Sequence, residues 1–333
     1  MKKYLLFIVF FALLIGMIYA ANPQMLWQNL LQMRWMLLVC VGIWVVGYLL
    51  NALSFASILG IYPKTRSFGY LETLRVTIAG YAINYVTPLG LLGGEPYRVW
   101  ELRRYIGLKA ATSSVLLYAM MHVCSHFLFW IIGCLLAVFL MPNIGWALGV
   151  ALVGVSLISV LLIILFFGGY RRGLVTVLVN RLTRMPGVGQ RIEKWQSVHA
   201  SQLSDVDSGI SLLLLQHPGR FWFSLCVELL SRMVNVAEIA VLFMQLDLFP
   251  EGTLYGASYL VVAFSSLFAN LLFFSPLQMG TREGGILLVL LKLLPTFSYA
   301  ALLPVALSIS LATRIREFVW IAIGLLLGTF RKQ

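Results

Sequence analysis

The sequence predicts an all-α polytopic membrane protein built as an inverted repeat of two halves, each with about three transmembrane helices and one re-entrant helical hairpin. The first observation is composition. Of the 333 residues, 61% are hydrophobic and only 11% are charged, too few to give a water-soluble globule a polar surface. The second is a Pro-to-Glu pattern that occurs once in each half of the chain, inside a hydrophobic stretch. The bilayer is therefore the expected solvent.

The repeated pattern occupies residues 87–95 and 275–283. In each, a hydroxyl residue, Pro and Leu precede a Glu that lies at the same offset from the Pro. Because Pro removes a helical hydrogen bond and nearby Gly eases bending, each pattern predicts a break in a membrane helix. Paired broken helices are typical of a midplane binding site in transporters. The residues predicted to form the breaks are Thr87, Pro88, Gly93, Gly94, Ser275, Pro276 and Gly280.

The first half of the chain is residues 1–140. It begins with an apolar run over residues 2–21, which matches the roughly 20 residues that cross about 30 Å of hydrocarbon. A signal-peptide cut after Ala20 would place Ile18 where a small residue is required, so we expect an uncleaved first span. Two lysines before this span place the N-terminus in the cytoplasm, and the run over 35–61 returns to that side.

A re-entrant hairpin is predicted over about residues 68–95. Basic residues flank this stretch on both sides, at Lys64, Arg66, Arg98, Arg103, Arg104 and Lys109. A single crossing would put one group on the wrong side of the membrane. A hairpin that opens to the cytoplasm and turns within 87–94 avoids this. It leaves residues 96–110 in the cytoplasm, and residues 110–140 then cross outward.

The second half, residues 141–333, is expected to repeat this order upside down. Residues 146–169 lead back to the cytoplasm, where the segment 170–218 carries the largest group of basic residues. That segment mixes apolar and polar residues, as an amphipathic helix on a membrane surface does. The net charge of +12 is concentrated in such connections, which marks cytoplasmic loops and does not indicate nucleic-acid binding.

The remaining segments complete the predicted inversion. Residues 219–246 lead outward to a connection without basic residues, a second hairpin over about 254–295 opens outward, and residues 297–330 return the C-terminus to the cytoplasm. The last run is either one long helix or two shorter ones, because a charged group interrupts it at Arg314, Arg316 and Glu317.

Charged side chains inside spans cost at least about 2.5–3.5 kcal/mol each, so those retained should have partners or a purpose. Glu228 and Arg232 lie four apart and can pair on one helix face, either as a structural staple or as part of a working site. Broken helix ends suit an anionic group, whereas Glu95 and Glu283 could hold a cationic headgroup or exchange protons. The predicted substrate-binding or transport residues are Glu95, Arg98, Arg282, Glu283, Arg314, Glu228, Arg232 and Glu238.

Metal and cofactor sites are not predicted. His122 and His126 are four apart on one predicted helix and could share a metal, but that segment has no carboxylate beside them. The cysteines lie within apolar runs without metal-ligand spacing, and we expect small core residues at Cys40, Cys124, Cys134 and Cys226.

Residues 91–98, Leu-Leu-Gly-Gly-Glu-Pro-Tyr-Arg, resemble the Gly-Gly-Glu-Pro-x-Arg element of the lysylphosphatidylglycerol synthase transmembrane region, also called the flippase-like domain family. Residues 275–284, Ser-Pro-Leu-Gln-Met-Gly-Thr-Arg-Glu-Gly, resemble its Pro-Gly-Gly-x-Gly-x-x-Glu element. The resemblance covers nearly the whole chain, including the position of Arg314. Two departures leave the choice of lipid open: Gln278 and Thr281 replace small residues, and residues 118–122 replace an acidic and basic cluster.

The resemblance implies movement of lipids or lipid-linked molecules between leaflets, and in aminoacyl-lipid members the spans carry lysyl-lipid outward. The expected partners are membrane lipids: an anionic or zwitterionic phospholipid, or a polyprenyl phosphate. The segment 170–218 is too short for a transferase domain, so any transferase would be a separate polypeptide. The alternatives are a non-catalytic membrane subunit of a lipid-modifying or cell-envelope glycan assembly system, and an intramembrane enzyme, for which no convincing nucleophile, base or metal cluster is found.

Overall fold

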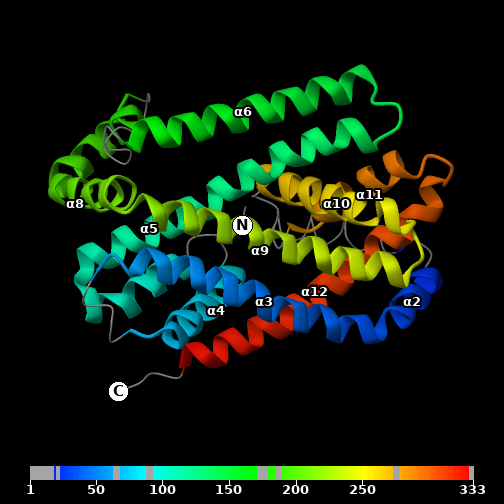
Figure 1. Cartoon of the computed structure of the whole chain (residues 1–333), viewed down its shortest axis with the longest axis horizontal. Coiled ribbons are helices and arrows are strands. Elements are labelled where there is room, and N and C mark those ends of the chain that lie inside the picture. The colour runs from blue at the N-terminus through cyan, green and yellow to red at the C-terminus, as the bar shows by residue number, and fades with distance from the viewer. Residues whose placement is uncertain are drawn as a thin grey trace.

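The computed structural model describes residues 19, 23–62, 68–87, 93–170, 179–184, 189–272 and 278–329, and throughout these residues the regular elements are helices (Figure 1). The all-α prediction is therefore confirmed. The helices that position the site are α2 (Pro23–Gln32), α3 (Arg34–Leu59), α4 (Tyr70–Val86), α5 (Gly94–Leu140), α6 (Trp146–Tyr170), α8 (Gly189–Gln216), α9 (Pro218–Gln245), α10 (Glu251–Leu271), α11 (Thr281–Leu293) and α12 (Tyr299–Thr329).

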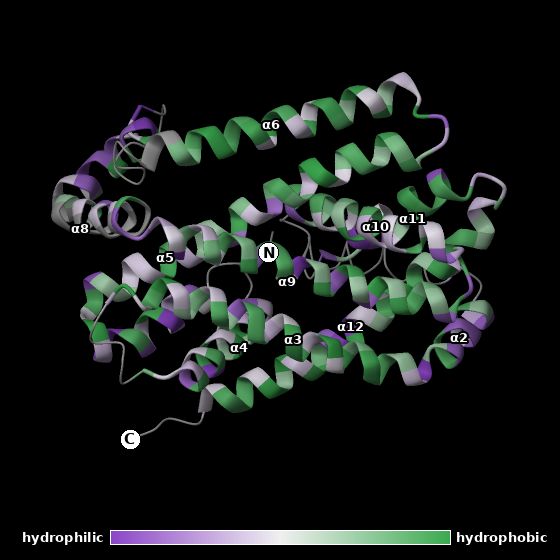
Figure 2. Ribbon diagram, in the orientation of Figure 1, coloured by the Kyte–Doolittle hydropathy of each residue, from purple (hydrophilic) through white to green (hydrophobic). Residues whose placement is uncertain are grey.

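The chain is a multi-pass membrane protein. Within the described residues, the helices α3, α5, α6 and α10 are long and apolar enough to cross a bilayer. Helix α6 is hydrophobic along most of its length and exposes large side chains such as Val150, Val153 and Leu157 (Figure 2). A helix that exposes apolar residues in this way is stable only with lipid around it. The expected first span, residues 2–21, lies outside the described residues.

Helices from the two halves of the sequence interleave in the bundle. Helix α3 packs along α9, and α4 packs along α12, whereas α6 lies at the edge against α5 and α8 (Figure 1). The α4–α12 contact is very close, because a Cβ atom added to Gly324 would lie 2.6 Å from the Cβ atom of Ala82. Each half of the chain therefore supplies part of the packing surface of the other.

The first predicted break separates α4 from α5. The α4 helix ends at Val86, α5 begins at Gly94, and a Cβ atom on Gly94 would lie only 2.1 Å from the carbonyl oxygen of Gly80. Helix α5 is itself interrupted at Gly107, whose φ of 81° is in the left-handed region. We call residues 94–106 the return arm.

The return arm is helical and packs against α4. Its residues 96–106 belong to the segment that the charge rule predicts on the cytoplasmic side, and the side chains of Arg98 and Glu101 are buried. The charge rule does not predict this burial, because it takes no account of the partners that α4 supplies. The basic residues at the far end, Arg103, Arg104 and Lys109, are exposed. Pro88 lies outside the described residues.

The second predicted break separates α10 from α11. Gln278 and Gly280 have φ values of 56° and 77°, and α11 begins directly afterwards at Thr281. Helix α11 lies against α10 so closely that a Cβ atom on Gly285 would be 2.7 Å from the Cα atom of Ser265. Two further residues of the predicted break, Ser275 and Pro276, lie outside the described residues.

Two remaining expectations are decided by the fold. The last run is one helix, α12, which continues through the charged group at Arg314, Arg316 and Glu317. Of the four cysteines, Cys40, Cys124 and Cys134 are buried as predicted, but the prediction was wrong for Cys226, which is exposed. An apolar run on a membrane helix has a lipid-facing side, so hydrophobic neighbours alone do not place a residue in the core.

Candidate functional site

A first polar cluster holds the α4–α5 turn. Asn84 accepts a hydrogen bond from the backbone nitrogen of Gly94 at 2.7 Å through its Oδ1 atom, so it satisfies a free amide at the start of the return arm. Its Nδ2 atom donates to Glu95 Oε1 at 3.2 Å, and Arg98 Nη1 donates to the same oxygen at 3.0 Å. The other oxygen of Glu95 is buried without a hydrogen bond. The glutamate is therefore oriented but incompletely satisfied.

The Arg98 guanidinium is 2% exposed. It lies over the rings of Tyr81 and Tyr118, with its Cζ atom 4.9 and 5.3 Å from their centroids. Gly80 makes room for it, because a Cβ atom there would lie 2.6 Å from Arg98 Nε. The Nε and Nη2 atoms have no hydrogen bond. The contacts with Glu95 and the aromatic rings therefore stabilise the buried charge.

A second cluster joins α5 to α9. His122 Nδ1 and Glu228 Oε2 are 2.8 Å apart, and the carboxylate is 1% exposed, whereas the histidine side chain is 33% exposed. Arg232 donates from Nε to Ser125 Oγ at 2.9 Å, from Nη1 to His126 Nε2 at 3.0 Å and from Nη2 to the carbonyl oxygen of His122 at 2.6 Å.

These contacts change the interpretation of Glu228 and Arg232. Helical spacing allowed the two to pair with each other, yet among the described residues each forms its hydrogen bonds with α5 instead. The two histidines, considered for a metal, are the partners in those bonds. Groups of three or more metal-binding side chains are not found in the described part of the chain.

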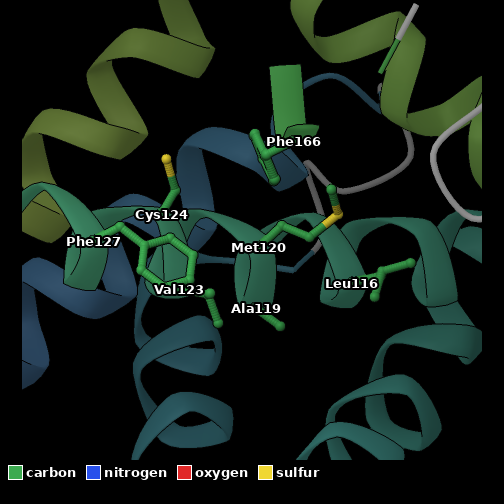
Figure 3. Close-up of a pocket in the computed structure, with 7 residues that line it drawn as sticks. All are labelled: Leu116, Ala119, Met120, Val123, Cys124, Phe127 and Phe166. Carbon is green, nitrogen blue, oxygen red and sulfur yellow. The ribbon is translucent and has the colours of Figure 1, made fainter. Parts of the chain in front are cut away.

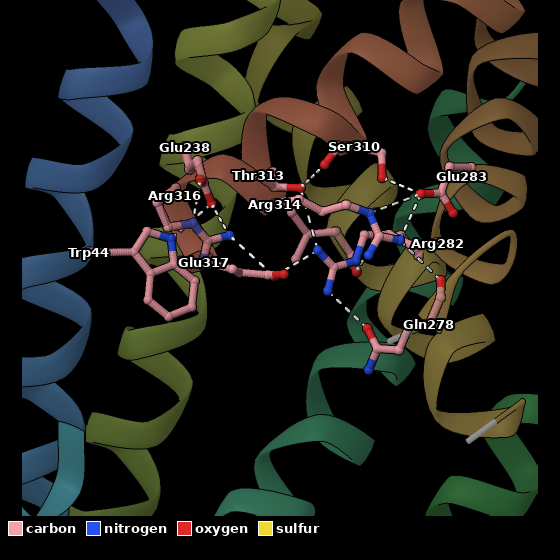
Figure 4. Close-up of polar contacts among 12 residues, drawn as sticks. Trp44, Glu238, Gln278, Arg282, Glu283, Ser310, Thr313, Arg314, Arg316 and Glu317 are labelled. Carbon is pink, nitrogen blue, oxygen red and sulfur yellow. Dashed lines mark hydrogen bonds and ion pairs between the residues drawn. The ribbon is translucent and has the colours of Figure 1, made fainter. Parts of the chain in front are cut away.

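A third cluster, at the start of α11 and the middle of α12, is the largest (Figure 4). Glu283 Oε1 accepts hydrogen bonds from Ser310 Oγ at 2.6 Å and from Arg314 Nη2 at 2.8 Å. Arg282 forms an ion pair with Glu317, with Nη1 2.7 Å from Oε1, and donates from Nη2 to Gln278 Oε1 at 2.9 Å. Charged side chains of α11 and α12 thus surround the described end of the second break.

The same cluster extends to α9 and α3. Arg316 donates to both oxygens of Glu238, at 3.0 and 3.2 Å, and its guanidinium lies 3.8 Å from the ring centroid of Trp44. The Trp44 indole also donates to Glu238 Oε2 at 2.9 Å. Arg316 Nη2 is 3.8 Å from Glu317 Oε1, so the chain of charges is continuous from α9 to α11.

Aromatic rings connect the clusters. The ring of Tyr48 lies 5.7 Å from that of Trp44, in the third cluster, and 5.9 Å from that of Tyr81, in the first. The Tyr81 hydroxyl is 3.0 Å from the Tyr118 hydroxyl and 3.4 Å from His122 Nδ1, in the second cluster. A band of polar and aromatic side chains therefore crosses the interior of the bundle.

The structure brings most of the predicted site residues together, in three groups. In the first group, Glu95 pairs with Arg98. In the second, Glu228 contacts His122 and Arg232 contacts His126. The third group contains Arg282, Glu283, Arg314 and Glu238. Glu95 and Glu283 lie in separate groups, and the bonds described for each stay within its own group.

Sequence reasoning missed several residues of these clusters. Two of them, Arg316 and Glu317, carried a usable signal, because charges in an apolar run need partners. Uncharged members, such as Asn84, Trp44 and Ser310, gave none, since such residues are ordinary in membrane helices. A further missed site lies between α4 and the return arm, where Arg75 contacts Glu72 at 2.8 Å and Glu101 at 2.7 Å.

Comparison with known proteins places these features in a family. Searches of curated proteins and of solved structures found no match. The sequence profile of the lysylphosphatidylglycerol synthase TM region matches residues 3–324. This range includes all three polar clusters and every described helix apart from the end of α12. With nearly its whole length matched, the chain belongs to the lysylphosphatidylglycerol synthase TM region family.

Proposed function

We propose that this protein is a lipid translocase of the cytoplasmic membrane that moves a phospholipid or a lipid-linked phosphate between leaflets. The observation that carries the proposal is the set of charged residues beside the two helix breaks: Glu95 with Arg98, and Glu283 with Arg314 and Arg282. Keeping this many charges inside an apolar bundle is costly, and such residues in membrane proteins usually line the path of a polar substrate.

The clusters offer what a crossing headgroup needs. A phosphate or ammonium group that leaves water must replace its hydration, and arginine and glutamate side chains at fixed positions can do so. In the third cluster the arginines Arg282, Arg314 and Arg316 are matched by the glutamates Glu238, Glu283 and Glu317. A zwitterionic or anionic headgroup would enter by exchange with one of these pairs, while its acyl chains stay in lipid.

The proposed cycle relies on two inverted halves. In this scheme α4 with the return arm is a re-entrant hairpin open to the cytoplasm, and α10 with α11 is its counterpart open to the outside. Both termini are then cytoplasmic. Close packing of α4 on α12 would couple the halves, so that each cluster opens toward one leaflet in turn.

A second candidate is a non-catalytic subunit of a lipid-modifying or envelope-glycan assembly system, served by a separate transferase. One observation favours it: Glu238, Arg316 and Arg282 are already bound to protein partners, as structural staples would be. In the translocase these pairs must open, whereas in an assembly subunit they stay closed.

Lipid movement in vesicles that contain only this protein separates the two candidates. Glu95→Gln keeps the size of the side chain while removing its charge, so transport should be lost. Because the buried Arg98 then lacks its ionised partner, thermal unfolding of the variant is measured alongside. Glu251→Gln, at an exposed position at the start of α10, is the matched control and should be silent. Unchanged movement of several headgroups in a Glu95→Gln, Glu283→Gln double variant would reject the translocase.

A further inference from the structure

A groove wide enough for one hydrocarbon chain lies outside the charged clusters, between α5 and α6. It has a volume of about 250 Å³ and is lined by apolar side chains, including Leu116, Ala119, Met120, Val123, Phe127 and Phe166 (Figure 3). All but Phe166 come from one face of α5. Pockets for drug-sized molecules have volumes of about 300–1,000 Å³, so this groove fits a single hydrocarbon chain better than a whole lipid.

The groove faces the side of the bundle that lipid reaches. Val123 is 49% exposed, and α6, the other wall, is the helix at the edge of the bundle with exposed apolar residues on its outer face. A chain entering from the bilayer would therefore not have to pass a polar surface.

A histidine borders the groove. His122 follows Ala119 by three residues and precedes Val123, so its side chain lies on the adjoining face of α5. It is 33% exposed midway along the apolar part of this helix, whereas its partner Glu228 is buried. An ionisable side chain exposed at this depth is unfavourable in hydrocarbon unless a polar group meets it there.

We propose that a phospholipid docks from the side between α5 and α6, with one acyl chain in the groove and its phosphate at His122. This inference rests on the proposed function and locates the entrance to the transport path. An ionised Glu228 can only accept, so His122 Nδ1 carries the proton of their bond and Nε2 faces away from the carboxylate. In the imidazolium form, Nε2–H donates to a phosphate oxygen.

The entrance is continuous with the buried clusters. Tyr81 contacts His122 through its hydroxyl, and its ring lies under the Arg98 guanidinium. A phosphate at His122 is thus one aromatic ring away from the next buried cation and from Glu95. This connection favours a lipid over another apolar occupant of the groove, since neither a protein helix nor a second copy of the chain would need a cation at its edge.

The test uses the full chain in vesicles that contain phosphatidylglycerol with a photoactivatable group on one acyl chain. Peptide mass spectrometry maps the adducts. We expect them to concentrate on residues 116–127 of the wild type, relative to the equally apolar residues 132–139 further along α5. Equal labelling of the two segments in the wild-type protein would overturn the proposal. Equal labelling is also what a groove covered by protein would give.

Two substitutions sharpen the result. Ala119→Trp fills the groove and should abolish labelling there, whereas Leu135→Trp, at an exposed position outside the groove, should not. Phosphatidylglycerol should label the groove about tenfold more than diacylglycerol with the same chain, as expected for one hydrogen bond to a charged group. His122→Phe should remove this preference and keep diacylglycerol labelling, and a preference that survives in His122→Phe contradicts the phosphate site.

The outcomes separate this inference from the proposed function. Uniform labelling together with normal lipid movement would overturn the lateral entrance and leave the translocase intact. Labelling confined to the groove in a protein that moves no lipid would support the docking site and reject translocation.

Discussion

The guanidinium of Arg316 on α12 donates to both carboxylate oxygens of Glu238 on α9, at 3.0 and 3.2 Å, and lies against the Trp44 ring of α3. One ion pair thus joins three helices from both halves of the chain. Both side chains are at most 5% exposed. Such a pair contributes little net stability compared with apolar residues, but removing either partner alone leaves an uncompensated charge.

The Glu238–Arg316 pair should therefore show strong non-additivity. Glu238→Gln and Arg316→Met should each destabilise the protein by about 3–5 kcal/mol, and the double variant should lose less than the sum. Thermal unfolding of the four proteins in one detergent gives the coupling energy. Additive losses would mean that the two side chains are not coupled in the membrane-embedded protein.

Glu228 should couple more strongly to His122 than to Arg232. The bond at 2.8 Å joins Glu228 to His122, whereas Arg232 is bound to Ser125 and His126. In double-mutant cycles, Glu228→Gln with His122→Asn should give an interaction energy of about 0.5–3 kcal/mol, and Glu228→Gln with Arg232→Met a smaller one.

The measurement is again thermal unfolding, with lipid movement assayed alongside. A larger interaction energy for Glu228 with Arg232 than for Glu228 with His122 would show that Glu228 and Arg232 pair with each other on one face of α9. Loss of transport in a well-folded Glu228→Gln, Arg232→Met double variant would place both residues on the transport path.

Gly80 should be intolerant of a methyl group. A Cβ atom there would meet the buried Arg98 guanidinium at 2.6 Å, so Gly80→Ala should cost about 1–3 kcal/mol by overpacking. Gly42, in the middle of α3, has no atom within 4 Å of an added Cβ atom, and Gly42→Ala should be neutral or slightly stabilising. Equal melting temperatures for the two variants would show that Arg98 moves aside easily.

Cysteine accessibility tests the topology. In a background with Cys226→Ser, because that thiol is exposed, we expect Arg104→Cys to react with an impermeant reagent from the cytoplasmic side. The α8 segment should react from that side too, whereas Glu251→Cys should react only from outside. Reaction of Arg104→Cys from outside would refute the orientation of the first hairpin.

Helix positions were readable from the sequence because they follow from the length of apolar runs. The run expected over 219–246 is α9, which begins at Pro218 and ends at Gln245, and the run expected over 146–169 is α6. The break at the start of α11 was marked by its Gly and Pro residues, and Gly280 indeed has a positive φ. These features are local, so the sequence contains their cause.

The partners of the buried charges were not readable. His122 and Glu228 are separated by 106 residues, and Arg316 lies 78 residues from Glu238, so only the packing of whole helices brings them together. The burial of charges in the return arm was not readable for the same reason, because Arg75 and two tyrosine rings lie beside them only in the folded bundle. Local spacing instead suggested the pairing of Glu228 with Arg232.

Gly107 is the backbone position at which the return arm could rotate relative to the rest of α5. An added Cβ atom there would meet nothing within 4 Å, and the left-handed φ of 81° belongs to this one residue inside an otherwise unbroken helical stretch. Rotation about that backbone would carry Arg98 and Glu101 together as a rigid lever, without unwinding the helix over 108–140. The resistance to such a swing would then come from the contacts that fasten the arm to α4, which include the two hydrogen bonds made by Asn84 at its start and the Arg75–Glu101 ion pair.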